Sequence, residues 1–243
     1  MRYFIFFAYD GTNYHGWQIQ PNGISVQEVL QDSLSKILRQ KIEVVGAGRT
    51  DTGVHAKVMA AHFDWQGIAL DCQQTAYRLN RLLPRDISVD RLQPVADDMH
   101  ARFSAKWRTY HYYIHTRKNP FLRHFSLETH YDLDFEAMNR AGHLLEQHTD
   151  FAAFCKAGAD NKTTLCQLKE CRWVETGDGS WYMTITANRF LRNMVRAVVG
   201  TMFLVGRHKI SLEEFQHILD NGSRSDAGES MPANALFLWN VEY

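Results

Sequence analysis

The sequence predicts an α+β fold of two lobes, each with a sheet covered by helices. Short apolar runs of strand length are mixed with helical patterns, and several strand patterns follow one another directly, which favours hairpins over a doubly wound parallel sheet. The second half of the chain repeats the order of elements in the first half without repeating its residues. A chain of 243 residues, 45% of them hydrophobic, can form two modest lobes. We place the lobes at 1–103 and 104–243.

The first lobe begins with a strand pattern and a capped helix. The run YFIFFAYDG is rich in aromatic residues and ends in Asp10 and Gly11, a turn signal, which predicts a buried strand. Ser25 followed by Glu28 forms a capping box, and apolar residues recur behind it at helical spacing as far as Leu38. We therefore expect an amphipathic helix after Ser25.

The rest of the first lobe is predicted as strand, strand, helix and strand. The runs KIEVVGAG (41–48) and KVMAAHFDW (57–65) have the composition of strands. Asp71 offers an N-cap for a helix that is stopped by Pro84. The run DISVDRLQPV (86–95) is the next expected strand.

The second lobe is predicted to follow the same order. RTYHYYIHT (108–116) predicts a strand, and a helix is expected from near Asp134, where apolar residues recur every third or fourth position. Two further strands are expected, at CQLKECRWVE (166–175) and WYMTITAN (181–188).

The last two predicted elements are helices. One is apolar and is expected to begin at about Phe190. The other begins at a second capping box, Ser211 with Glu214, and ends near Gly222.

The composition argues against several classes of protein. The 27 basic and 27 acidic residues leave no net charge that would mark the whole molecule as a nucleic-acid or membrane-surface binder, so any such signal must be local. The four cysteines have no C-x-x-C spacing and no signal peptide is recognisable, so we expect a reduced, cytoplasmic protein. The longest apolar segment, 190–206, contains two arginines and is too short to span a membrane. The twelve histidines lack metal-ligand spacing, so no metal is expected.

One segment combines positive charge with aromatic side chains. From Arg102 to Leu127 the chain has six Lys or Arg residues and no acidic residue, interleaved with Phe, Trp and Tyr. Cations neutralise phosphates while aromatic rings stack on unpaired bases, so this combination suits single-stranded or looped nucleic acid. It is equally typical of a strand whose alternate residues fill a core while the charged ones face solvent.

A second segment without acidic residues runs from Ile185 to Lys209. If it is helical, Arg189, Arg192 and Arg196 form one stripe at i, i+3 and i+7, with the apolar residues largely away from it. The counter-charges of the three arginines are then phosphates or a buried carboxylate. Arg192 is accordingly a candidate for binding a substrate.

The run GAGRTDTGVHA (46–56) is glycine-rich and carries a carboxylate with two readings. If GRTD is extended, Arg49 and Asp51 project to the same side, and the guanidinium favours an ionised carboxylate. Alternatively, Asp51 forms an Asx turn and caps backbone amides around Gly53. Taken alone, the run favours the turn.

Several blocks of the sequence together resemble one enzyme family. GRTDTGVHA (48–56) resembles the catalytic motif of pseudouridine synthases of the tRNA pseudouridine synthase A family. Further blocks resemble that family in its own order: YDGTNYHGWQIQPNGISVQEVL, LNRLLPRDI, HARFSAKWRTYHYYI, HTDFAAF, FLRNMVRAVVG and MPANALFL. The resemblance covers essentially the whole chain and is more specific than any single motif.

The resemblance implies roles for particular residues. It implies that Asp51 is the nucleophile, that Tyr110 stacks on the target uracil, and that Arg196 pairs with Asp51. Arg49 resembles the arginine that helps to displace the target nucleotide, and Leu236 matches an apolar residue that lines the pocket. Arg49 is then turned toward the RNA rather than toward Asp51.

The resemblance also implies a fold and a substrate. The expected architecture is two α/β lobes that share an extended, mainly antiparallel sheet flanked by helices, with a basic catalytic cleft between them. The expected protein is a homodimer that acts on the tRNA anticodon stem-loop at positions 38 to 40, without metal or organic cofactor. Departures from the family pattern occur at Thr52, Met59 and Ala235, none of which is an expected catalytic residue.

The expected reaction converts uridine to pseudouridine on a base flipped out of the RNA. Asp51 attacks either C6 of uracil or C1′ of ribose, and the sequence leaves both open. The alternative is a non-catalytic RNA-binding or RNA-folding protein on the same scaffold. A metal-dependent nuclease would need clustered carboxylates, which the sequence lacks.

Overall fold

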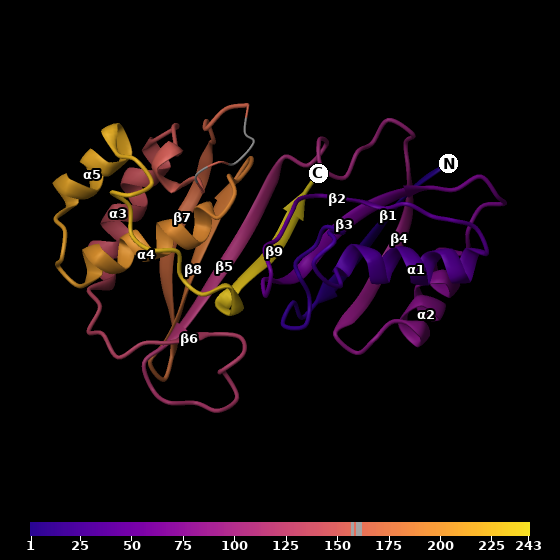
Figure 1. Ribbon diagram of the computed structural model, residues 1–243, viewed down its shortest axis with the longest axis horizontal. Coiled ribbons are helices and arrows are strands. Elements are labelled where there is room, and N and C mark those ends of the chain that lie inside the picture. Colours follow the sequence, from indigo (N-terminus) through magenta and orange to yellow (C-terminus); the bar gives the residue numbers. More distant parts are fainter. Residues whose placement is uncertain (157, 159–161) are drawn as a thin grey trace. The chain divides into compact units, whose positions relative to one another are not determined.

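The computed structural model describes residues 1–156, 158 and 162–243. The chain forms two compact units (Figure 1). Unit 1 comprises Met1–Lys106 together with Phe237–Tyr243, and unit 2 comprises Trp107–Leu236.

Unit 1 is a mainly antiparallel sheet with two helices. Its elements are β1 (Arg2–Tyr9), α1 (Val26–Leu38), β2 (Val45–Gly46), β3 (His55–Asp64), α2 (Cys72–Leu82), β4 (Ile87–Val95) and β9 (Leu236–Glu242). The strands are ordered β4-β1-β3-β9, and β2 pairs with β3. β1 is antiparallel to both of its neighbours, whereas β9 runs parallel to β3.

The helices of unit 1 begin where their caps predict. The Ser25 hydroxyl accepts the N–H of Glu28, and the Asp71 carboxylate accepts the N–H of Gln74, so each cap satisfies one of the unpaired amides of a first turn. α2 contacts β4 and α1. The core contains fully buried side chains from the strands and from α1, among them Phe4, Phe63 and Leu30.

The strand predicted over 41–48 is wrong except for Val45–Gly46. Side chains of α1 take the backbone groups that a strand would have used. The Gln31 side chain accepts the N–H of Val44, and Gln27 donates to the Val44 carbonyl. The segment therefore lies along the helix rather than in a ladder.

The described residues of unit 2 form mainly antiparallel strands and three helices. Its elements are β5 (Trp107–His115), β6 (Leu127–Glu128), α3 (Phe135–Gln147), the 3-10 turn Ala152–Phe154, β7 (Leu168–Gly177), β8 (Ser180–Ala187), α4 (Met194–Gly206), α5 (Leu212–Asn221) and the 3-10 turn Ala233–Ala235. The strands are ordered β5-β8-β7 and are antiparallel, while β6 pairs parallel with β5. The predicted caps Asp134 and Ser211 begin α3 and α5, and Ser211 forms the full capping box with Glu214.

The helices of unit 2 pack closely through glycines. α3 contacts β7 and α4. A Cβ at Gly142 of α3 would lie 2.1 Å from the Cys171 carbonyl oxygen, so only glycine allows this approach. α4 is buried on nearly all sides, which explains its apolar sequence.

The predicted helix start at about Phe190 is wrong, and so is the predicted helical stripe of Arg189, Arg192 and Arg196. α4 begins only at Met194, because Asn193 has a left-handed backbone (φ 67°) that a helix cannot contain. Arg189 and Arg192 therefore lie in the irregular segment before the helix, and of the three only Arg196 is helical.

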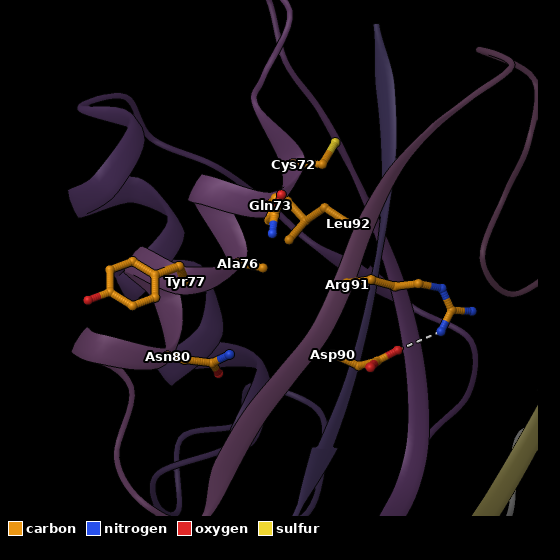
Figure 2. Close-up of a pocket in the computed structure, with 8 residues that line it drawn as sticks. All are labelled: Cys72, Gln73, Ala76, Tyr77, Asn80, Asp90, Arg91 and Leu92. Atoms are coloured by element: carbon orange, nitrogen blue, oxygen red, sulfur yellow. Dashed lines mark hydrogen bonds and ion pairs between the residues drawn. The ribbon is translucent and has the colours of Figure 1, made fainter.

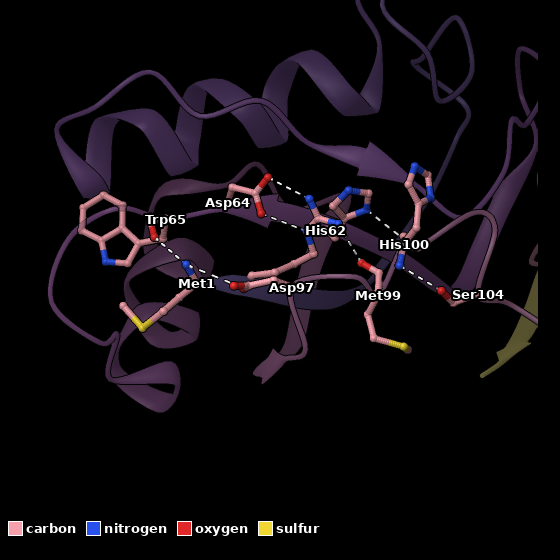
Figure 3. Close-up of polar contacts among 10 residues, drawn as sticks. Met1, His62, Asp64, Trp65, Asp97, Met99, His100 and Ser104 are labelled. Carbon is pink, nitrogen blue, oxygen red and sulfur yellow. Dashed lines mark hydrogen bonds and ion pairs between the residues drawn. The ribbon is translucent and has the colours of Figure 1, made fainter.

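A network of polar contacts lies beside β1 in unit 1 (Figure 3). Arg2 donates two hydrogen bonds to the Asp64 carboxylate. His62 is 5% exposed, and its Nδ1 accepts the N–H of Ala101. Burial, with the positive charge of Arg2, lowers the pKa of His62 to about 4, so this histidine is neutral at pH 7.

The predicted fold class is confirmed. Both units are α+β, with mainly antiparallel strands flanked by helices. Within the described residues, no helix combines the length and apolar character needed to cross a membrane.

Candidate active site

The loop that carries Asp51 connects β2 to β3 in unit 1. Its backbone is irregular from residue 47 to residue 54, so the alternation expected of an extended GRTD does not apply. The N–H of Val54 donates to the Asp51 carbonyl at 3.1 Å, which closes a turn, and Gly53 within it has φ +78°. Asp51 thus stands at the first position of a glycine-dependent turn. Its side chain is half-buried and that of Arg49 is exposed.

A second segment, residues 9–17, holds this loop in place. The Tyr9 hydroxyl lies 2.8 Å from the Thr50 hydroxyl, and the N–H of Trp17 donates to the Thr50 carbonyl at 3.3 Å. Gly16 has φ +83°, and a Cβ there would lie 2.3 Å from the Thr50 carbonyl oxygen. The residue before Asp51 is therefore fixed by both its side chain and its backbone.

Gly11 and His55 fix the other side of the loop. A Cβ at Gly11 would lie 2.0 Å from the Val54 carbonyl oxygen, and the Gly11 N–H donates to Nδ1 of the fully buried His55 at 2.9 Å. The same nitrogen lies 3.1 Å from Oδ1 of Asp10. The His55 ring stacks on Phe237 of β9 at 4.6 Å. The loop rests on backbone contacts that larger residues would break.

These supporting residues were not assigned by the sequence reasoning. The signal was present in YDGTNYHGW, where Gly11 and Gly16 are spaced within a strand-to-helix connection. Spacing alone cannot pair these residues with the Asp51 loop, since each contact joins residues more than 40 positions apart in the chain.

Tyr110 lies on β5 of unit 2, opposite Ile185 of β8. Its half-buried ring contacts Phe190 edge-to-face, with 5.0 Å between centroids and an interplanar angle of 85°. Such a contact fixes the orientation of a ring. Phe190 is a further aromatic of this site that the sequence reasoning assigned only to a helix.

Arg196 lies in the first turns of α4 and is anchored by its side chain. Its Nε donates to the Met231 carbonyl at 2.5 Å, and the Met231 N–H donates to the Arg196 carbonyl at 3.2 Å. The neighbouring Tyr112 hydroxyl donates to the Pro232 carbonyl at 3.0 Å. Burial raises the pKa of Tyr112, and the positive charge of Arg196 opposes that increase. The guanidinium is therefore oriented by the segment around residues 231–232.

That segment is itself held against α4. Arg224 donates to the Gly228 carbonyl at 2.8 Å and to the Ser230 hydroxyl at 2.9 Å, and Asn193 also bonds Ser230. The Gly228 N–H donates to the Thr201 hydroxyl at 2.8 Å. Several residues thus fix the chain between Arg196 and the start of β9.

The remaining predicted site residues are Leu236 and Arg192. Leu236 is buried at the start of β9, and Arg192 is exposed in the segment before α4. Asp51 and Arg49 belong to unit 1, whereas Tyr110, Arg192, Arg196 and Leu236 belong to unit 2. Any role that requires a residue of unit 1 to act together with a residue of unit 2 remains a prediction.

A hollow in unit 1 is separate from the Asp51 loop (Figure 2). It has a volume of about 420 Å³ and is lined by Cys72, Gln73, Ala76, Tyr77, Asn80, Asp90, Arg91 and Leu92. Two of its polar groups are engaged locally: the Asn80 amide bonds both backbone groups of Val89, and Arg91 donates to Asp90 at 2.6 Å. It contains none of the predicted site residues. Within the described residues, no group of three His, Cys, Asp or Glu side chains is placed to hold a metal ion.

Comparisons with known proteins agree on one family. The family profile described as tRNA pseudouridine synthase matches residues 5–104 and 143–243. The chain is 54% identical to tRNA pseudouridine synthase A of Bacteroides fragilis over 242 residues, which cover 100% of this chain and 96% of that protein. It is 39% identical to tRNA pseudouridine synthase A of Bacillus subtilis, covering 97% of this chain and 96% of that protein. A chain of the archaeal box H/ACA sRNP Nop10-Cbf5 complex is 8% identical with a TM-score of 0.37, covering 96% of this chain and 58% of that one, which is too low to support an inference.

Proposed function

This chain belongs to the tRNA pseudouridine synthase family, and we propose that it isomerises uridine to pseudouridine in tRNA with Asp51 as the nucleophile. The full-length similarity to proteins named tRNA pseudouridine synthase A supports the activity. The observation that carries the assignment of Asp51 is its position on a turn that Gly53, Gly16 and Thr50 hold from several sides. A fixed carboxylate on a close-packed loop is what covalent catalysis without a cofactor requires.

The reaction moves one bond of the ribose from nitrogen to carbon. The bond between N1 and C1′ breaks, the base turns, and C5 bonds to C1′. C5 then loses its proton, and N1 carries a hydrogen in the product. No oxidant or reductant is consumed. A carboxylate that adds to C6 or to C1′ and later leaves can carry this sequence, and both routes remain open.

Arg196 is proposed to keep Asp51 ionised and oriented. Its Nε is bound to the Met231 carbonyl, so the guanidinium is pre-oriented before any substrate arrives. A planar guanidinium can present two parallel donors to a carboxylate, which an ammonium cannot. The pairing joins residues of different units and is part of the proposal.

The other site residues are proposed to handle the flipped base. Tyr110, oriented by Phe190, stacks on the uracil, and Leu236 supplies an apolar wall. Arg49 is exposed and takes the place of the displaced nucleotide in the stack, while Arg192 contacts the RNA backbone. Extruding a base from its stack costs a few kcal/mol, which these contacts offset.

The finer properties come from the family resemblance. We propose that the targets are positions 38 to 40 of the anticodon stem-loop and that the protein works as a homodimer. Mapping pseudouridine in tRNA from a deletion strain tests the positions, and sedimentation velocity tests the dimer.

The decisive variant is Asp51→Asn. It removes the nucleophilic charge at nearly constant size, so we expect no measurable tritium release from tRNA labelled at uridine C5, while the Kd for unmodified tRNA changes less than about threefold. Asp32→Asn, at an exposed carboxylate on α1, is the matched control and should keep full activity. Substantial turnover by Asp51→Asn would refute the assignment.

The alternative, an RNA-binding protein without catalysis, is not favoured by the comparisons. It predicts tight binding of unmodified tRNA by the wild-type protein and no pseudouridine after long incubation. The same tritium assay therefore separates the two functions.

A further inference from the structure

The connection between β5 and β6 is basic, aromatic and exposed. Residues 117–125, here the β5–β6 loop, extend away from the three helices of unit 2 (Figure 1). The loop carries Arg117, Lys118 and Arg123, all exposed, and no acidic residue occurs between Met99 and Leu127. The Phe121 side chain is 88% exposed.

The three cations of this loop lack an acidic partner in the part of the chain that the structure describes. Among the described residues, no carboxylate lies within ion-pair distance of Arg117, Lys118 or Arg123. Their neighbour His124 accepts a hydrogen bond from Arg123 and supplies no negative charge. The positive charge of the loop is therefore available to an external anion.

Both ends of the loop are firmly anchored. At its start, the Thr116 N–H donates to the Gly179 carbonyl at 2.9 Å. At its end, the buried Ser126 hydroxyl lies 2.9 Å from Nδ1 of the buried His115, and β6 pairs in parallel with β5. The anchors lie on the sheet that carries Tyr110.

The interior of the loop is also structured. The Asn119 side chain accepts the N–H of Phe121 at 2.9 Å, and the Phe125 N–H donates to the Leu122 carbonyl at 2.9 Å. These bonds form consecutive turns that present Phe121 to solvent. An exposed ring on such a turn loses little conformational entropy when it stacks on a flat partner.

The loop lies next to the segment that orients Arg196. The Asn234 side chain donates to the Arg123 carbonyl at 3.3 Å, and Asn234 stands between Met231, the partner of Arg196, and Leu236. All of these residues belong to unit 2. A nucleic acid bound at Tyr110 and Arg196 would therefore have the loop beside it.

We propose that the β5–β6 loop is a second RNA contact, in which Phe121 stacks on an unpaired base outside the target uridine and Arg117, Lys118 and Arg123 bind the flanking phosphates. This inference rests on the proposed function, because it names a further part of the tRNA site. Charge complementarity decides the occupant: within the described residues the three loop cations have no carboxylate partner, and the segment contains no acidic residue. An aromatic ring among such cations matches the stacking platforms that bind single-stranded RNA.

The first test uses Phe121 variants with unmodified tRNA transcript as the probe. Phe121→Ala and Phe121→Leu should each weaken Kd about tenfold, because base stacking is lost, whereas Phe121→Trp should bind as wild type. The rate at saturating tRNA should stay within about twofold of wild type, since the loop does not touch the reacting atoms. Tyr77→Ala, at an exposed aromatic on α2, is the control and should leave Kd unchanged.

The second test removes the three loop cations together. The triple variant Arg117→Ala, Lys118→Ala, Arg123→Ala should flatten the slope of log Kobs against log salt by about 2, since about 0.7 to 0.9 counterions are released per phosphate contact. The control is the triple variant of Lys41, Arg140 and Arg172 to Ala, which removes the same charge at cations that each have a carboxylate within 3.3 Å. Its slope should match wild type.

The outcomes separate this inference from the proposed function. Wild-type pseudouridine formation with unchanged Kd and salt slope in both loop variants would overturn the inference and leave the function standing. A fall in the rate at saturating tRNA without a change in Kd would also overturn it. The same holds if the wild-type protein binds phosphatidylserine vesicles and the loop variants lose that binding while they keep their affinity for tRNA. No pseudouridine from the wild-type protein would instead refute the proposed function.

Discussion

Arg196 shows how one residue can depend on a distant backbone group. Its Nε donates to the Met231 carbonyl, and this bond orients the guanidinium. The neighbouring Tyr112 hydroxyl donates to the next carbonyl, that of Pro232. The sequence places Arg196 in a family motif, but no local pattern links it to Met231, which is 35 residues further along the chain.

Arg196→Lys tests whether the planar guanidinium, with its two parallel donors, is needed. A lysine keeps the charge but cannot hold the Met231 carbonyl and present two parallel donors, so we expect kcat to fall about 10- to 100-fold with a smaller change in KM. Steady-state kinetics on unmodified tRNA measure this. Arg140→Lys, at an exposed ion pair on α3, is the control and should leave kcat unchanged. A kcat for Arg196→Lys within twofold of wild type would show that charge alone suffices.

His62 gives a prediction about stability and pH. Burial lowers its pKa to about 4, whereas an unfolded histidine titrates near ~6.5. Between these values the unfolded chain binds a proton that the folded chain does not. The free energy of unfolding should therefore fall as pH drops from about 6.5 toward 4, with His62 contributing at most about 1.4 kcal/mol per pH unit.

Urea denaturation of His62→Gln checks this contribution. Glutamine can still accept the Ala101 N–H but does not titrate, so the pH slope of stability should be shallower than in wild type. His130→Gln, at an exposed histidine outside the network, is the control and should keep the wild-type slope. An unchanged slope in His62→Gln would contradict the assignment.

At the scale of elements, α4 packs against the segment after α5 through two glycines, Gly200 and Gly228. A Cβ at Gly200 would lie 1.9 Å from the Glu229 carbonyl oxygen, and Gly228 lies directly against the Gly200 backbone. The same segment continues to Met231, so the closeness of this contact determines where Arg196 is anchored.

Gly200→Ala should therefore reverse a general rule. In an exposed helix interior the change from Gly to Ala stabilises by about 1 kcal/mol. Here it should destabilise by about 1 to 3 kcal/mol, because the new Cβ displaces the Glu229 carbonyl, and it should lower kcat by shifting Met231. Urea denaturation measures the first effect. Gly48→Ala, where a Cβ meets nothing within 4 Å, is the stability control. A Gly200→Ala variant more stable than wild type would contradict this prediction.

At the scale of the whole molecule, the end of the chain completes the unit with which the chain begins. β9 runs parallel to β3, the Lys106 N–H donates to the Glu242 carbonyl at 2.7 Å, and the Tyr243 hydroxyl donates to the Ala101 carbonyl at 2.8 Å. The last seven residues thus pack in unit 1 after the chain has formed all of unit 2.

Leu238→Ala tests this long-range dependence. Leu238 is 2% exposed, so its truncation should cost about 2 to 5 kcal/mol. Hydrogen exchange should rise in β3, more than 170 positions away in the chain, as well as in β9 itself. Leu82→Ala, at a side chain that is 46% exposed, is the control. Faster exchange confined to unit 2 would contradict the packing.

Local signals account for most of the elements. Caps at Ser25, Asp71, Asp134 and Ser211 are visible in the sequence because a capping side chain and its amide are three residues apart. The prediction failed at 41–48 and at Phe190, where side chains of α1 and the left-handed Asn193 changed the local backbone. Family motifs supplied the site residues, and their roles remain predictions.

The sequence by itself determined the fold class, the positions of the capped helices and the family. These follow from spacing within a few residues or from motifs in a fixed order. Only the tertiary structure decided that Gly16 and Tyr9 hold Thr50 beside Asp51, that Met231 anchors Arg196, that Phe190 orients Tyr110, and that the last strand returns to the first unit. The two partners of each contact share no local pattern, because folding brings together their backbone groups, hydroxyls or rings from distant positions in the chain.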